Sequence, residues 1–515
     1  MILENGVIRT LDRTLPIARA LAIAGDRIAG GVGTHETALA SPDVVDLGGR
    51  CVVPGFTDAH VHFVGWSIGQ RELRLEGTRS LDEALARVRA AAGSVPPGGW
   101  LRGRGWRSGD WRGQVEPTRQ ALDAVTGDVP AALTARDGHS LWLNSAALSV
   151  ADGDLRAAGG VVEVDGRGEP TGVLREESAW RFRETYVEST YTAAECLDAV
   201  RAGLKLAASR GVTAVHAAVT DNDHWLGGLP FFERLDAEDV LTLRVWNWLP
   251  HELVSELASL RLRSAFGSER LRLGALKAFM DGTLGSQTAL LLDGGGVEIT
   301  TRAQLTEIIL RGAACGFPVA VHAIGDRANR NALDAFEATR DVWQPLGLRQ
   351  RIEHAQLLAP EDVPRFAQLG VAASVQFSHA TSDRDLADRN WAGMTERAYA
   401  YRTLADAGAL LANGSDAPVE ELDPLAGIRA GALRTQDERE AWHPEQRLGV
   451  DEALEATCVA PAWLEGAERR RGKLLPGYFA DLVVLSTDPV ENLEACEVVA
   501  TMLGGRWVFN PPPWA

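Results

Sequence analysis

The chain has 515 residues, and its 52 basic and 70 acidic side chains give a net charge of −18. This negative charge repels the phosphates of nucleic acids and anionic membrane surfaces, so we expect neither as a partner. The length exceeds one barrel domain of about 250 residues, so more than one folding unit is expected.

The remaining composition is typical of a globular enzyme, with 45% hydrophobic and 24% charged residues. No run of about 18 apolar residues is present, and the N-terminus lacks a basic segment followed by an apolar one, so we expect a cytoplasmic protein. The five cysteines lie far apart without a CxxC pair, which indicates reduced thiols. The sequence carries no signal of oligomeric state, and a homodimer stays open.

Both ends of the chain have the pattern of short strands separated by turns. The N-terminal strands are predicted at residues 2–10, 18–32 and 44–54, with hairpin signals at Asn5-Gly6 and Gly25-Asp26. Similar strands and glycine-rich turns follow Glu465. Since each end alone is too small to bury a core, we predict that residues 1–51 and 466–515 form one β-sandwich domain.

The first motif with metal-ligand chemistry follows the apolar run 51–56. His60 and His62 stand two positions apart in GFTDAHVHF, and residues i and i+2 of a strand point to the same face. The two imidazoles can therefore bind one cation. Because such pairs also occur as hydrogen-bonded structural features, the interpretation depends on motifs further along the chain.

Residues 67–200 separate this strand from the next predicted one, far more than an ordinary connection needs. We predict that they form a subdomain inserted at the active-site face, where it selects the substrate. Candidate substrate contacts are Trp106, Trp111 and Trp142 for stacking, and Arg104 or Arg175 for a carboxylate. Each of these also fits an ordinary core position or surface ion pair. His139 lies in a polar Asp-Gly-His turn, which favours a place in the pocket.

Seven further apolar segments complete a set of eight strands with the first one at 52–59. They are predicted at residues 212–217, 243–248, 273–279, 319–322, 351–354, 371–377 and 410–414. A capping-box pair, Thr192 and Glu195, begins a helix that stops before Gly211, and a second helix spans 303–315. The alternation predicts an α/β protein with a (β/α)8 TIM barrel over residues 52–465.

Four more motifs end in residues of metal-ligand type. They are ALKAFMDG (275–282), VAVHAIGD (319–326), RIEHAQ (351–356) and NGSDAP (413–418). His322 and His354 are separated by about one βαβ repeat, and His354 and Asp416 by about two, at roughly 30 residues a repeat. The motifs therefore fall at the ends of strands four, five, six and eight, on the face where barrel enzymes build active sites.

The other histidines carry weaker signals. His216 ends strand two, where it either lines the pocket or satisfies a carbonyl group. The remaining ones show no ligand spacing, and we interpret them as solvated or structural: His35, His224, His251, His379 and His443.

The long motifs KAFMDGTLGSQTA, DGHSLWLNSAAL, VHAIGDRAN, RIEHAQ and GSDAPVEELDPL, with GKLLPGYFADLVVL near the C-terminus, resemble the amidohydrolase superfamily of metal-dependent hydrolases. More narrowly, they resemble its YtcJ-like branch, which includes N-substituted formamide deformylases. The resemblance covers nearly the whole chain. It implies a distorted (β/α)8 barrel with a hydrolytic metal centre.

Two divalent metal ions are implied by the resemblance. His60 and His62 would bind the more buried ion with Asp416 beside it, and His322 and His354 would bind the second. Some members of the superfamily keep one metal only, so a mononuclear centre stays open.

The resemblance also implies that Lys277, at the end of strand four, is carboxylated by carbon dioxide and bridges both ions, because an unmodified ammonium would repel them. Imidazole and carboxylate ligands suit Zn²⁺, with Mn²⁺ or Fe²⁺ as alternatives. A metal-bound water has its pKa lowered from 15.7 to about 7, so a hydroxide is available to attack a carbonyl carbon.

Roles for the remaining polar residues follow from this chemistry. Asp416 is predicted to take the proton of the nucleophile and pass it to the leaving nitrogen. His139 or His216, with one metal, would polarise the carbonyl oxygen. Asp281 and Asp326 follow the ligands of strands four and five, where each either orients a ligand or structures a loop.

We therefore predict hydrolysis of a non-peptide C–N bond, an N-acyl or N-formyl amide, in a small-molecule substrate. A carboxylic ester or lactone hydrolase is the alternative, because the same nucleophile attacks esters. An inactive metal-binding protein is disfavoured, since all five motifs remain together. The identity of the substrate depends on how residues 67–200 fold over the centre.

Overall fold

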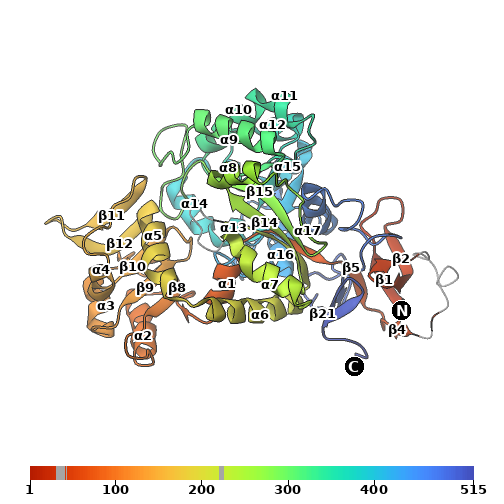
Figure 1. Cartoon of the computed structure of the whole chain (residues 1–515), viewed down its shortest axis with the longest axis horizontal. Helices are drawn as coiled ribbons and strands as arrows, with labels where there is room; N and C mark the ends of the chain where they lie inside the picture. Colours follow the sequence, from red (N-terminus) through yellow and green to blue (C-terminus); the bar gives the residue numbers. More distant parts are fainter. Residues whose placement is uncertain (30–40, 42, 220–225, 515) are drawn as a thin grey trace.

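The computed structural model describes residues 1–29, 41, 43–219 and 226–514. Figure 1 shows a barrel of strands and helices in the middle, an α/β insertion on one side and a sheet built from both termini on the other. All five cysteines are free thiols, as predicted. None of the helices that the structure describes is long and apolar enough to cross a membrane.

The barrel is a sheet of eight strands in which all neighbours are parallel. Its strands are β6 (Phe56–Val61), β13 (Val212–Ala217), β14 (Arg244–Pro250), β15 (Leu271–Phe279), β16 (Val319–Ala323), β17 (Arg351–His354), β18 (Ala372–Val375) and β19 (Leu411–Asn413). They are almost entirely buried, as expected for parallel strands covered by helices. The ring nearly closes between β19 and β6, where the Asp416 amide donates to the His60 carbonyl at 2.7 Å. The predicted α/β barrel is therefore confirmed.

The predicted first strand, residues 52–59, is wrong in extent. Gly55 separates β5 (Cys51–Pro54), which pairs with the terminal sheet, from β6, which begins the barrel. A Cβ at Gly55 would lie 2.1 Å from Oγ1 of Thr213, so only glycine fits where the chain passes between the two sheets. One apolar run thus serves two sheets, which periodicity alone does not reveal.

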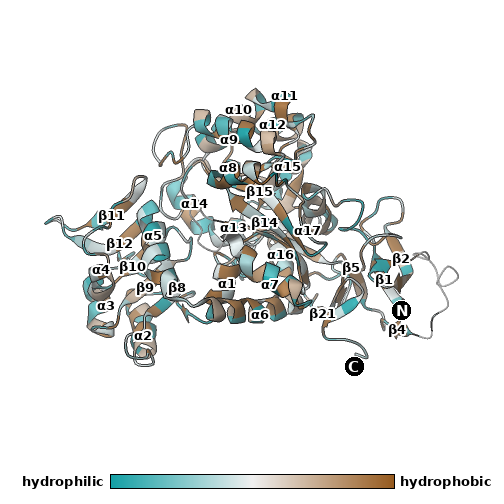
Figure 2. Ribbon diagram, viewed as in Figure 1, coloured by the Kyte–Doolittle hydropathy of each residue, from teal (hydrophilic) through white to brown (hydrophobic). Residues whose placement is uncertain are grey.

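Helices cover the outside of the barrel, and their ends follow signals in the sequence. They include α6 (Ala193–Ser209), α7 (Leu229–Ala237), α8 (Val254–Ser259), α9 (Arg302–Cys315), α10 (Asp326–Ala338), α12 (Val363–Leu369), α15 (Tyr401–Asp406), α16 (Pro424–Leu433) and α17 (Val450–Leu464). Thr192 and Glu195 form the predicted capping box of α6. Gly316 ends α9 in the left-handed conformation, with a φ of 76°. Figure 2 shows apolar and polar residues mixed along α6, whose apolar residues pack on β13.

Strands from both termini pair in one sheet. The path runs through β22 (Arg506–Phe509), β21 (Val498–Leu503), β20 (Leu482–Leu485), β5, β1 (Ile2–Arg9), β2 (Ile17–Ala24) and β3 (Arg27–Ile28), with β4 (Val44–Asp46) beside β1. The described strands thus form a single continuous sheet, and the two layers of the predicted β-sandwich are not seen among them. Residues 30–32 of the second predicted strand lie outside the described residues.

The two hairpin signals near the N-terminus differ in outcome. Gly25 does turn the chain between β2 and β3. Asn5 does not: it has a φ of 58° inside β1, where the register with β2 shifts. A left-handed residue within a strand produces a bulge rather than a reversal when the chain on both sides pairs with the same neighbour.

The insertion has a six-stranded sheet and a hydrophobic core of its own. The sheet order is β11 (Gly160–Val164), β12 (Pro170–Glu176), β10 (Ser140–Leu143), β9 (Ala131–Ala135), β8 (Leu101–Trp106) and β7 (Leu73–Arg74). Helices α2 (Leu81–Ala92), α3 (Arg119–Thr126), α4 (Ser145–Ser149) and α5 (Glu177–Phe182) pack around it. Its loops lie over the carboxyl ends of the barrel strands, where they help to line the main cavity.

Candidate metal centre and cavity

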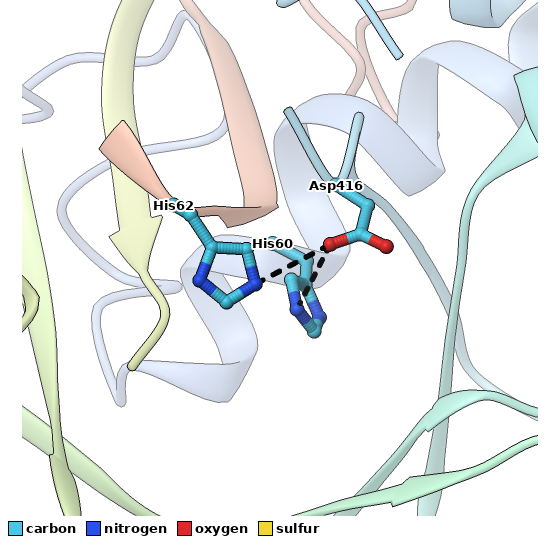
Figure 3. Close-up of side chains that lie close together, drawn as sticks. All are labelled: His60, His62 and Asp416. Carbon is cyan, nitrogen blue, oxygen red and sulfur yellow. Dashed lines mark ion pairs between the residues drawn. The ribbon is translucent and has the colours of Figure 1, made fainter. Parts of the chain in front are cut away.

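Three side chains of ligand type converge where the ring of barrel strands closes. His60 lies near the end of β6, His62 precedes α1 (Phe63–Gly69), and Asp416 follows β19. Oδ1 of Asp416 lies 3.4 Å from Nε2 of His60 and 3.5 Å from Nε2 of His62 (Figure 3). Asp416 has a φ of 57°, which costs energy for any residue with a side chain. The surrounding structure holds this strained conformation.

The neighbouring strand ends add two imidazoles and a lysine. His322 lies in β16 and His354 ends β17, and their ring centres are 4.5 Å apart. The ring of His354 also lies 5.0 Å from that of His60. Lys277 of β15 is buried beside them, with Nζ 4.6 Å from the ring centre of Phe279. The structure thus brings all six residues that the resemblance implies as ligands to one end of the barrel.

One ring nitrogen of each of three histidines bonds an oxygen of the surrounding protein. These pairs are His60 Nδ1 with Glu353 at 2.6 Å, His354 Nδ1 with Gln376 Oε1 at 2.8 Å, and His322 Nε2 with the Gly282 carbonyl at 3.1 Å. Since these oxygens accept, the bonded nitrogen carries the proton and the opposite nitrogen keeps its lone pair. Metal-binding histidines are oriented in the same way.

The charge states of these groups favour metal binding. Burial, together with the charge of Lys277, lowers the pKa of His60 and His322 below the ordinary value for histidine. Burial alone would raise the pKa of Asp416, but His60 and His62 lower it below its ordinary value. Neutral imidazoles and an ionised carboxylate are the forms that bind a metal ion.

The candidate ligand atoms form two overlapping groups. One comprises His60, His62 and Asp416, the other His354, His379 and Asp416, and within each group the atoms lie within 4.8 Å of one another. Asp416 belongs to both. Nitrogen and oxygen donors in this mixture suit Zn²⁺, Mn²⁺ or Fe²⁺, so the donor set fits a divalent metal centre.

A cavity of about 220 Å³ extends from these side chains into the insertion. Five arginines lie in its wall, and four of them form ion pairs: Arg104 with Glu76, Arg107 with Asp383, Arg136 with Glu420, and Arg183 with Glu188. Within the described part of the chain, Arg102 has no carboxylate oxygen within 4.0 Å. Its guanidinium stacks on Tyr191 at 3.9 Å. Arg102 is therefore the wall arginine best able to meet an anionic group of a ligand.

His139 reaches the cavity from the insertion. It lies on the turn between β9 and β10, with its ring centre 5.9 Å from that of His322 and 4.8 Å from that of Trp180. Nδ1 lies 2.6 Å from Oε2 of Glu176. Burial opposes protonation, but Glu176 raises the pKa of His139 above its ordinary value. The structure places this predicted residue in the cavity wall, beside the candidate ligands.

The structure corrects the predicted substrate contacts of the three tryptophans and of Arg175, whereas Arg104 does lie in the cavity wall. Trp106, Trp111 and Trp142 pack on one another, with ring centres 6.0 to 6.2 Å apart, and all three are buried in the core of the insertion. Arg175 pairs with Glu163 at 2.9 Å, away from the cavity. The three tryptophans thus complete the subdomain's own core, and Arg175 is held by carboxylates of the insertion itself. The aromatic residues that line the cavity are instead Phe63, Trp180, Tyr191 and Phe279.

His216 does not line the cavity. It is fully buried inside the barrel, with Nδ1 2.7 Å from the Arg351 guanidinium and Nε2 2.9 Å from Glu465. Since Arg351 is donor-only, Nδ1 accepts and Nε2 donates, so both nitrogens are used within the protein. The predicted role of His216 in polarising a carbonyl group is therefore corrected to a structural one.

Asp281 and Asp326 differ in how near they lie to the candidate ligands. Asp281 accepts three backbone N–H groups, and Oδ1 lies 3.6 Å from Nε2 of His322; burial raises its pKa to about 7. It therefore shapes the loop beside His322. Asp326 begins α10 and accepts from the Leu292 amide at 2.8 Å, with Arg397 at 3.4 Å, so the structure assigns it to the loop alone.

Three residues near the centre escaped the sequence analysis. His379, which the sequence classed as structural, follows β18 in α13 (Phe377–Ser382), with Nε2 4.0 Å from Oδ2 of Asp416. Glu353 orients His60, and Glu176 orients His139. His379 could have been predicted from its place just after a barrel strand, and Glu353 from its place next to His354 on β17. His35 and His224 lie outside the described residues.

A model of the amidohydrolase family matches residues 43–509. The protein named "LONG AFTER FAR-RED 3" of Arabidopsis thaliana is 32% identical, over 99% of this chain and 91% of its own length. The Bacillus subtilis protein named "Putative amidohydrolase YtcJ" is 30% identical, over 94% and 95%.

Two further relatives bear on the chemistry. An N-substituted formamide deformylase of Arthrobacter pascens is 27% identical, over 98% of this chain and 97% of its own length. Among solved structures, a metal-dependent hydrolase from Pyrococcus horikoshii matches with a TM-score of 0.77 and 27% identity, covering 95% of this chain and 98% of that one.

Proposed function

The chain belongs to the amidohydrolase family of metal-dependent hydrolases, and from that premise we propose that it cleaves the C–N bond of a small N-formyl or N-acyl amide. The observation that carries this proposal is the gathering of ligand-type side chains in the wall of one cavity, with His139 of the insertion beside them. Similarity to an N-substituted formamide deformylase over nearly the whole chain supports the bond type.

The proposed centre would hold two divalent ions, with Zn²⁺ preferred. His60, His62 and Asp416 would hold one ion, and His322 and His354 would hold the other. A carbamate of Lys277, formed with carbon dioxide and with release of a proton, would help to hold both ions. The charge balance supports this step, since a cationic Lys277 depresses the pKa of the histidines around it and would repel metal ions.

Bound divalent ions would supply a water of lowered pKa and polarise the carbonyl group of the substrate. Asp416 then takes the proton from the attacking water, which its ionised state at neutral pH permits. It passes that proton to the leaving nitrogen as the C–N bond breaks. His139 donates a hydrogen bond to the carbonyl oxygen, whose negative charge grows as the carbon becomes tetrahedral.

The cavity supports a small-molecule substrate. Its volume of about 220 Å³ is below that of most drug-sized ligand sites. Trp180 and Phe279 provide an apolar wall, and Arg102 provides a cationic rim. We propose that the group carried by the amide meets this wall, and that an anionic substituent, where present, meets Arg102.

A substrate panel tests the bond type. N-alkyl and N-aryl formamides and acetamides are offered beside formate and acetate esters of matching size, with release of amine or acid measured. We expect amine release from the preferred amide to exceed the background rate, measured with the Asp416→Asn variant, by at least about 100-fold. Cleavage of esters at enzyme levels that leave every amide intact would replace the amide assignment with the ester or lactone alternative.

A further inference from the structure

A buried glutamate of the insertion stands in a conformation that few non-glycine residues adopt. Glu176 ends β12 with a φ of 50° and is fully buried. Its amide donates to the His139 carbonyl at 2.8 Å, so the strained turn is tied to the same backbone that carries the cavity histidine. Strain of this kind persists where the structure around it determines the position of a side chain.

Both carboxylate oxygens of Glu176 have defined partners. Oε2 lies 2.6 Å from Nδ1 of His139, and Oε1 accepts the hydroxyl groups of Ser286 at 2.7 Å and Thr288 at 2.6 Å. These hydroxyls belong to the loop that follows β15, the strand that carries Lys277. One carboxylate therefore connects the insertion to the barrel rim and fixes the position of His139 relative to the candidate centre.

The contacts also determine which nitrogen of His139 is available. An ionised carboxylate only accepts, so Nδ1 of His139 donates to it. Nε2 makes no hydrogen bond to any of the residues that the structure describes, and the ring lines the cavity beside His322 and Trp180. The nitrogen that remains is thus the one that a ligand in the cavity can meet.

The space around the carboxylate admits little movement. A Cβ added at Gly282 would lie 1.9 Å from Oγ1 of Thr288 and 3.0 Å from Oε1 of Glu176. The Gly282 carbonyl in turn accepts from Nε2 of His322 at 3.1 Å. The same loop therefore packs against Glu176 on one side and orients a candidate ligand on the other.

We propose that Glu176 is a positioning residue that fixes the tautomer and direction of His139, and that the pair is a dyad that binds the developing oxyanion of the substrate. The inference rests on the proposed hydrolysis and adds to it the residue through which the insertion takes part. Glu176 holds the Nδ1 proton, so Nε2 faces the carbonyl oxygen. No bond is formed or broken by the dyad itself.

A double-mutant cycle tests the dyad on whichever substrate class, amide or ester, the wild type hydrolyses. We expect His139→Ala to lower kcat by about 100-fold with little change in KM, as for loss of one oxyanion donor. Glu176→Gln should lower kcat by about 10- to 100-fold, and the double variant should be no slower than His139→Ala, because Glu176 acts through His139. Additive losses in the double variant would overturn the proposal.

Controls separate positioning from a loss of structure. Glu163→Gln, which removes an ion pair with Arg175 on the same sheet, should leave kcat unchanged. Metal content and circular dichroism of Glu176→Gln should match the wild type. If that variant does not fold, Thr288→Val, which removes one donor to Oε1, should lower kcat by about threefold with KM unchanged. A Thr288→Val enzyme with wild-type kcat would contradict the proposal.

A tetrahedral phosphonamidate analogue of the best substrate gives a second readout. It carries the negative oxygen that the dyad is proposed to bind, whereas the substrate does not. We expect Glu176→Gln to weaken inhibition by the analogue as much as it lowers kcat, with KM unchanged. Equal weakening of analogue and substrate would make Glu176 a general structural residue. An absence of amide turnover in the wild type would refute the bond assignment and leave the cycle measurable on esters.

Discussion

The barrel rim and the inserted subdomain both supply side chains to the cavity, but they do so in different ways. Candidate ligands on the rim come from the ends of parallel strands, which share one edge of the sheet by construction. The insertion contributes from turns, with His139 between two strands and Glu176 at a strained strand end. The repeated strand ends thus position the candidate ligands, and individual loop conformations position His139 and Glu176.

The tryptophans of the insertion also differ in what they contact. Trp180 lies in α5 of the insertion and faces the cavity, whereas Trp106, Trp111 and Trp142 fill the insertion's own core. A small subdomain needs large apolar side chains to be stable, and most of its tryptophans serve that need. The side chains that line the cavity, such as Trp180, are then among the few that the core does not use.

Asp416→Asn should produce the largest effect and would break the comparison if it did not. Loss of the proton-transferring carboxylate is expected to lower kcat by about 1,000- to 10,000-fold, while the imidazoles keep metal bound. Steady-state kinetics with metal analysis of the same sample measures both. Turnover within about tenfold of the wild type would remove Asp416 from its role and shift the chemistry away from the rim.

Trp142→Ala should act on stability and hardly on catalysis. The side chain is fully buried against two other tryptophans, so its truncation is expected to cost about 3–5 kcal/mol of the free energy of unfolding. Denaturant unfolding measures the loss, and KM at a temperature where the variant is folded should equal that of the wild type. A raised KM with unchanged stability would return the tryptophan to the substrate site.

Arg102→Ala tests whether the insertion contributes a charged contact to the substrate. For substrates with a carboxylate we expect KM to rise by about tenfold with kcat unchanged, since one charge-assisted contact is lost. Uncharged substrates of the same size should show no change. Arg136→Ala, whose arginine already pairs with Glu420 at 2.6 Å, is the matched control. Equal responses of both variants would show that Arg102 has no special place.

The smallest predicted effect concerns acid stability of the insertion. His139 and the two hydroxyls overcome the effect of burial and lower the pKa of Glu176 to about 2, from an ordinary value of 4.5. Because the pKa of Glu176 is lowered in the folded protein, its ionised form stabilises the fold at pH values above 4.5. This stabilisation is lost as the pH falls towards 2. The stability difference between wild type and Glu176→Gln should therefore shrink between about pH 5 and pH 3. A constant difference, measured by hydrogen exchange, would argue against an ionised Glu176.

Much of the barrel could be predicted because its signals are local. Apolar runs, a capping box at Thr192 and a glycine stop at Gly316 mark the elements, and the βαβ spacing orders them. The division of the first strand at Gly55 could not be predicted, since it depends on the distant Thr213 and on pairing with β20.

The candidate site divides in the same manner. Residues at strand ends, such as His322 and His354, follow from topology. Glu176 and His379 do not, because their positions depend on tertiary contacts between loops that are far apart in sequence. The predicted catalytic role of His216 is wrong for a related reason. Its place near a strand end is like that of a ligand, but Arg351 and Glu465 bond both its ring nitrogens.

Metal titration of the metal-free protein in bicarbonate, with amine release from an N-substituted formamide measured at each step, tests the central claim most directly. Activity should rise with occupancy to about two equivalents per chain in the wild type, and Lys277→Ala should bind about one. Amine release by metal-free protein, or full binding of two ions by Lys277→Ala, would contradict a bridged metal centre at the barrel rim.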